Sequence, residues 1–127
     1  MTAGPRPGPD EPDDVAGATG EDSAVQALED LVREIDHCAA ELREARARAE
    51  LLLTERRTGR AWLDIVTAEG HPLVVERVST VLSGLAGAGS AWRRAQARAL
   101  QDERVSINRI AALFGVTRQR ISALLRE

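Results

Sequence analysis

Apolar residues recur with alternating spacings of three and four over residues 23–57, which is the pattern of an amphipathic helix. Asp22 or Ser23 can cap the start of this helix, and Gly59 offers a stop at its end. Arg46 interrupts the pattern at one a position. The a and d positions of the heptad are otherwise occupied by Val25, Leu28, Val32, Ile35, Ala39, Leu42, Ala49 and Leu53.

A third apolar row follows the flank of this seam at seven-residue intervals and widens the apolar stripe. A stripe of this width is typical of a bundle, or of a dimer that is packed against another helix, rather than of an isolated two-stranded coil. We therefore expect helix 23–57 to be a coiled-coil-like dimerisation element. The third row consists of Leu31, Cys38, Ala45 and Leu52.

Three shorter helices are expected next, over residues 60–69, 72–85 and 91–103, the last capped by Ser90. Between the second and third, a cluster of glycines predicts a turn or hinge. Because no strand pattern occurs, we predict an all-α fold. The glycines are Gly84, Gly87 and Gly89, and the core anchors of these segments are expected to be Trp62 and Trp92.

The last 22 residues before Glu127 predict two helices joined by a sharp turn. Ser106 can cap a helix that runs through Phe114, Gly115 permits a positive φ, and Thr117 can cap a second helix over 117–126. Small or apolar residues at restrictive spacings would form the core of this helix-turn-helix. They are Ala111, Gly115, Ile121 and Leu124.

Charge is distributed unevenly along the chain. Residues 1–24 hold six acids and one Arg, whereas residues 88–127 hold three acids and eight Arg. The Pro/Gly-rich, acidic segment 1–22 has too few apolar side chains to join a core, so we expect a disordered tail. We predict a helical dimerisation or bundle region over 23–87 and a basic, DNA-binding helix-turn-helix region over 88–127.

The segment from Phe114 to Arg126, FGVTRQRISALLR, resembles the helix-turn-helix of region 4 of bacterial sigma factors and related regulators. The resemblance implies that Arg118, Gln119 and Ser122 face the bases. An acidic residue is common in the family at the position of Gln119, and a basic one at Ser122. The sequence read therefore differs from a promoter −35 element, and the resemblance implies DNA binding without sigma function.

The chemistry of the side chains favours the same three base contacts. Arg pairs with guanine and Gln with adenine in the major groove. Other polar and basic residues are expected to hold phosphates, which position the protein without specifying sequence. The expected backbone contacts are Thr117, Arg120, Arg109, Arg126, Arg94 and Arg98.

Other chemistries are less well supported by the residues. Neighbouring Asp36, His37 and Cys38 point in different directions on a helix, so no metal site is expected. Cys38 is expected to be a small core residue. No phosphate-binding loop, activated nucleophile or paired carboxylate indicates an enzyme, and no cofactor is expected. The acidic tail can contact a protein partner.

The sequence thus predicts a bacterial, cytoplasmic and nucleoid-associated regulator without a membrane segment, which binds double-stranded DNA as a homodimer through helix 23–57. Two alternatives stay open. One is a non-enzymatic adaptor that binds RNA polymerase or a regulator, and the other is an architectural protein without sequence preference. The operator, the sensed signal and the choice between activation and repression are left open.

Overall fold

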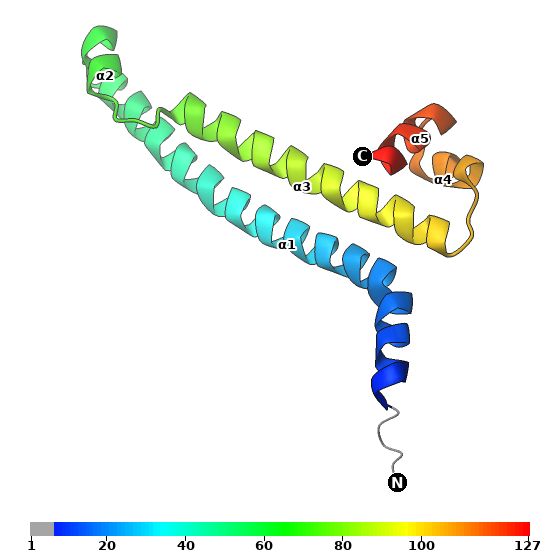
Figure 1. Ribbon diagram of the computed structural model, residues 1–127. Coiled ribbons are helices and arrows are strands. Elements are labelled where there is room, and N and C mark those ends of the chain that lie inside the picture. Colours follow the sequence, from blue (N-terminus) through cyan, green and yellow to red (C-terminus); the bar gives the residue numbers. More distant parts are fainter. Residues whose placement is uncertain (1–6) are drawn as a thin grey trace. The chain divides into compact units, whose positions relative to one another are not determined.

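The computed structural model describes the backbone of residues 7–127 and the side chains of residues 23–127. Within this range it consists of helices and their connections, without strands (Figure 1). The helices are α1 (Pro7–Arg57), α2 (Trp62–Ala68), α3 (Val74–Asp102), α4 (Ile107–Phe114) and α5 (Arg118–Arg126). The predicted all-α class and the long helix over 23–57 are confirmed. No described helix is both long enough and apolar enough to cross a membrane.

Helix α1 begins at Pro7, earlier than the predicted start near Ser23. The predicted acidic tail covers residues 1–22, which lie outside the residues whose side chains are described, so that tail stays a prediction. At the other end, Gly59 has a φ of 101° and the Arg60 amide donates to the Glu55 carbonyl at 3.1 Å. The expected glycine stop of this helix is confirmed.

The chain divides into two compact units. Unit 1 contains residues 1–30 and 89–127, and unit 2 contains residues 31–88. In unit 2, α1 and α3 run side by side in opposite directions and α2 lies in the connection between them (Figure 1). Cys38 Sγ of α1 lies 3.7 Å from the Val81 carbonyl oxygen of α3, and Arg77 pairs with Glu41 at 3.0 Å.

The predicted glycine hinge is wrong, because α3 is continuous from Val74 to Asp102. Gly84 lies instead on the side of α3 that faces α1. A Cβ at this position would lie 2.6 Å from Glu34 Oε2, the end of a flexible side chain that would have to move aside. A glycine in a helix costs about 1 kcal/mol relative to alanine, which the packing of Val81 and Leu85 can offset.

Trp62 does not anchor a core, contrary to expectation, since it is 53% exposed and stacks under the Arg56 guanidinium at 5.3 Å. Ile65, which is 2% exposed, holds α2 in place instead. A helix of seven residues can bury only a narrow face, and Ile65 occupies it. Trp92 is half-buried.

Candidate nucleic-acid interface

Both ends of helix α4 are capped by residues next to it in the sequence. The Ser106 hydroxyl accepts a hydrogen bond from the Arg109 amide at 3.1 Å. At the other end Gly115 adopts a φ of 69°, and the Val116 amide donates to the Ala111 carbonyl at 3.0 Å. This closure terminates the helix and turns the chain sharply, which only glycine does without strain.

Helix α5 begins at Arg118, three residues after Gly115. Thr117 has extended backbone angles, φ −78° and ψ 158°, and its hydroxyl accepts from the Arg120 amide at 3.1 Å. The predicted Ser106 and Thr117 caps and the predicted left-handed Gly115 are therefore present, whereas Ser90, predicted to cap a helix over 91–103, lies inside α3. Together α4, the turn at Gly115 and α5 form a helix-turn-helix in the structural sense.

The two helices are held together by a small apolar core to which α3 also contributes. Ile110 and Ile121 are completely buried, and Ala111 of α4, in the same cluster as Ile121 of α5, is 6% exposed. Because Ala111 carries only a methyl group, the two helices can approach closely at this point. The buried cluster consists of Ala97, Ile110, Ala111, Ile121 and Leu124, and it is surrounded by Leu100, Val105, Ile107, Phe114, Val116 and Leu125.

The side of α5 that faces away from this core carries polar residues. Helical geometry places Gln119, Ser122 and Arg126 opposite Ile121 and Leu124. Arg118, Gln119, Arg120 and Arg126 are exposed, and Ser122 is half-buried. The structure therefore brings the three sequence-predicted base contacts together on the first two turns of one short helix. Such a surface can offer several hydrogen-bond donors to an extended ligand.

The arginines of residues 89–127 fall into two groups. Arg93 lies over the Phe114 ring at 4.8 Å. Arg94 pairs with the Glu127 carboxylate at 2.8 Å, and Arg98 donates to the Glu127 backbone carbonyl. These three side chains join α3 to α4 or α5, so Arg94 and Arg98 are engaged within the protein rather than free for phosphates.

Five other arginines in this segment are exposed and make no side-chain hydrogen bond, ion pair or ring contact with the described residues. Leaving a cation unpaired in water costs little, and these guanidinium groups are available to an anionic ligand. They come from the α3–α4 connection, from α4 and from α5. They are Arg104, Arg109, Arg118, Arg120 and Arg126.

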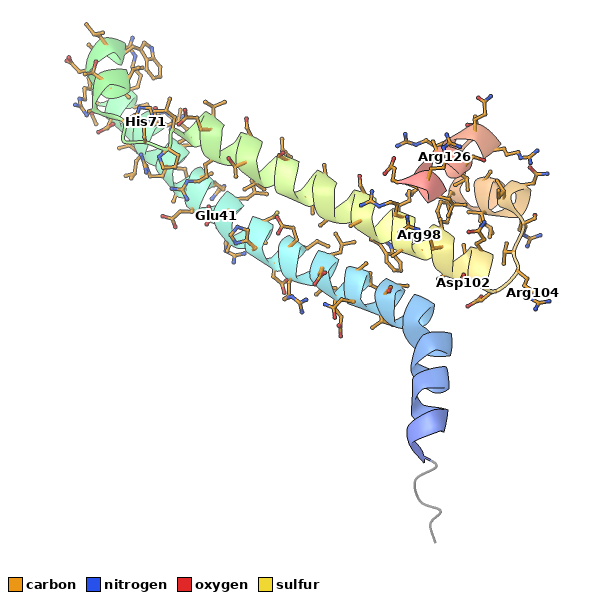
Figure 2. All side chains as sticks on the ribbon, viewed as in Figure 1. Glu41, His71, Arg98, Asp102, Arg104 and Arg126 are labelled. Atoms are coloured by element: carbon orange, nitrogen blue, oxygen red, sulfur yellow. The ribbon has the colours of Figure 1, made fainter. Side chains whose placement is uncertain are left out.

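Arg104 is the member of this group that the sequence reasoning missed. It lies in the connection between α3 and α4 (Figure 2) and has a φ of 68°. The Arg104 amide donates to the Gln101 carbonyl at 2.8 Å, and the Val105 amide donates to the Leu100 carbonyl at 3.0 Å. Arg104 thus occupies the helix-ending position that usually holds glycine. An arginine in a strained backbone conformation beside α4 leaves no signal in the sequence pattern.

Unit 2 contains a small cavity and the buried Cys38. Glu34, His37 and Glu41 line a cavity of about 260 Å³ between α1 and α3 (Glu41 is labelled in Figure 2). Cys38 is 3% exposed, so its expected place in the core is confirmed; burial, and then the hydrogen bond to Glu34 and the charge of that carboxylate, raise the pKa of its thiol. Among the described residues, no group of three or more His, Cys, Asp or Glu side chains is arranged to hold a metal ion.

Comparison of the chain with family models, with curated proteins and with solved structures gives no match.

Proposed function

We propose that this protein binds double-stranded DNA in a sequence-specific manner, with α5 in the major groove and the chain acting as a dimeric transcriptional regulator. The observation that carries the proposal is the helix-turn-helix itself, in which a capped, basic helix is packed through Ile121 and Leu124 and exposes Arg118 and Gln119 at its first turn. In DNA-binding units of this kind, the first turns of the second helix meet the base edges.

The assignment of roles follows from where each side chain lies. Arg118 and Gln119 can form bidentate hydrogen bonds with guanine and adenine respectively, and Ser122 can bond to either. Arg120 and Arg126 flank that surface, and Arg109 lies in the first turn of α4, which would approach the phosphate backbone. The Thr117 hydroxyl already accepts from the Arg120 amide but can still donate to a phosphate.

A dimer is part of the proposal because one helix-turn-helix contacts only a few base pairs. Two copies related by a two-fold axis would read two half-sites about 34 Å apart, one turn of the duplex. The element proposed to join them is the segment 23–57 of α1, where the apolar residues at a and d positions are exposed by 41–54% at Val25, Leu28, Val32, Ile35, Leu42 and Leu53.

The test is a titration of the full chain against a pool of random-sequence duplexes at two salt concentrations, followed by sequencing of the retained DNA. The Arg118→Ala, Gln119→Ala double variant serves as the probe. Arg48→Ala is the matched control, because it removes a positive charge from α1 at a position outside the apolar a and d row. We expect enrichment of an inverted repeat by the wild type and by the control, and loss of that enrichment in the double variant.

The rival functions give different results in the same experiment. An architectural protein would retain DNA in a salt-sensitive manner without enriching any sequence, because phosphate contacts alone carry no sequence information. An adaptor that binds only proteins would retain no DNA at either salt concentration. Either result would contradict the proposed sequence-specific function.

A further inference from the structure

Two apolar rows run along the part of α1 that belongs to unit 2, and only one of them is covered by α3. The covered row is the flanking one. Cys38 and Ala45 are both 3% exposed, and Leu31 and Leu52 at the same seven-residue spacing are half-buried. The packing of α1 against α3, and against α2 near Leu52, thus uses this flanking row and leaves the a and d positions unused.

The a and d positions of unit 2 form an uncovered strip, which we call the open seam. Its four large apolar side chains are 43–52% exposed, whereas Cys38 and Ala45 of the flanking row are 3% exposed. A regular strip of this kind is the surface on which a second amphipathic helix packs. The open seam consists of Val32, Ile35, Leu42 and Leu53, with Ala39, Arg46 and Ala49 between them.

The exposed edge beside the open seam carries charges that repeat every seven residues. In chain order they are Asp36, Arg43, Glu50 and Arg57. None of the four forms an ion pair with a described residue of α3. Asp36 and Arg43 are exposed and form no ion pair with the described residues. Since they are seven residues apart, about 10 Å along the helix, they cannot pair with each other within one chain.

We propose that a second copy of this chain covers the open seam, with its α1 antiparallel to the first and the two-fold axis passing between Ala40 and Glu41. In this register each copy's Leu42 packs on Ala39 of the other, and Val32 packs on Ala49. Asp36 of each copy then lies beside Arg43 of the other. The dimer core is a four-helix arrangement made from α1 and α3 of both copies.

The two Asp36–Arg43 pairs favour this register over its neighbours. It also places Glu29 of each copy beside Glu50 of the other, and Arg46 beside Ile35. A parallel pair would place Arg46 against Arg46 in the apolar seam, where like charges destabilise the pair. An antiparallel pair shifted by seven residues would place Asp36 beside Glu50 and Arg43 beside Arg43. A shift of fourteen residues would place opposite charges of this row side by side but leave Val32 and Ile35 without a partner helix. Only the proposed register covers Val32, Ile35 and Leu42 and also gives Asp36 an opposite charge.

This inference rests on the dimeric form of the proposed function and specifies its partner surface. The first test compares two leucine substitutions on the same helix by sedimentation equilibrium. Leu42→Glu places a charge in the open seam, whereas Leu51→Glu places one at a position that is 61% exposed and lies outside that seam. We expect a dimeric wild type, a monomeric but fully helical Leu42→Glu variant and a dimeric Leu51→Glu variant.

The second test is a charge exchange that reports orientation and register. Asp36→Arg and Arg43→Asp should each weaken the dimer about tenfold, because each places like charges together at two symmetric sites. The double variant should restore the wild-type dimer affinity. In a parallel dimer, or in the antiparallel register shifted by fourteen residues, the exchange would not restore it.

The outcomes separate this inference from the proposed DNA binding. A wild-type monomer at high concentration, or a Leu42→Glu variant that still dimerises, would overturn the proposed interface. If such a protein still retained DNA in a manner dependent on Arg118 and Gln119, the DNA-binding proposal would stand without it. A dimer that follows both tests but retains no DNA would overturn the DNA-binding proposal alone.

Discussion

Arg94 Nη1 in α3 lies 2.8 Å from Glu127 Oε1, at the opposite end of α5 from the Thr117 cap. Arg98, one turn further along the same face of α3, donates to the backbone carbonyl of Glu127. The two contacts tie the end of α5 to α3 and leave the first turn of α5 exposed.

This relationship predicts different behaviour for two arginines that the sequence alone assigned the same role. Arg94→Ala should destabilise the fold by about 0.5 kcal/mol, because the pair is partly exposed, and should leave the salt dependence of DNA affinity unchanged. Arg109→Ala should reduce the slope of log affinity against log salt concentration by about 1. Filter binding at several salt concentrations measures both slopes, and a reduced slope for Arg94→Ala would make it a phosphate contact.

Truncation of the buried Ile121 should destabilise the helix-turn-helix. Ile121→Ala removes atoms from a completely buried site, which typically costs about 3 kcal/mol. Leu113→Ala is the control, since Leu113 on α4 is 57% exposed and its truncation should change stability by about 0.5 kcal/mol or less. Urea unfolding followed by circular dichroism gives both values. Equal effects of the two substitutions would contradict the observed core.

Arg104→Gly should raise stability and lower DNA affinity at the same time. Glycine adopts the φ of 68° without strain, so the free energy of unfolding should increase by about 1 kcal/mol. If Arg104 holds a phosphate, the substitution also removes about one unit from the salt slope of DNA binding. Arg104→Lys retains the charge and should retain that slope. A Gly variant with wild-type affinity would remove Arg104 from the interface.

Gly87→Ala tests the continuity of α3 at the predicted hinge. A Cβ at Gly87 meets no heavy atom within 4 Å, so only the backbone preference changes. In a continuous helix the substitution should stabilise the protein by about 0.5–1 kcal/mol. A flexible or turned segment would be unaffected or destabilised by alanine. Thermal unfolding of the variant beside the wild type distinguishes these cases.

Glu76 makes stability depend on pH. Its Oε1 accepts a hydrogen bond from the Leu73 amide at 2.8 Å and lies 3.3 Å from His71 Nδ1, and these contacts, in that order, lower the pKa of the carboxyl. A group whose pKa is lower in the folded state stabilises the protein above its unfolded pKa, about 4.3 for Glu. That contribution disappears as the pH falls through the folded-state pKa.

Glu76→Gln should therefore lower the urea midpoint at neutral pH, and the difference from the wild type should shrink as the pH falls below about 4. Glu44→Gln, at an exposed position of α1, is the control and should show little difference at either pH. A Glu76→Gln difference that persists unchanged at low pH would contradict the predicted linkage.

The sequence by itself determined the features that depend on residues close together in the chain. Ser106, Gly115 and Thr117 act on amides and carbonyls within four residues, so their cap and turn roles follow from residue type and spacing. The burial of Ile121 and Leu124 follows from the period of one short helix. The exposure of Arg118 and Gln119 follows from the same period.

Only the tertiary structure decided which of two apolar rows on α1 is covered, why Gly84 continues a helix, and that Glu127 engages Arg94. Each outcome depends on a contact between residues more than thirty positions apart in the chain. From local spacing alone, either row of α1 is predicted to pack against a partner helix, and a glycine is predicted to interrupt a helix. The choice comes from packing, because the free energy of burying side chains against α3 exceeds these local preferences.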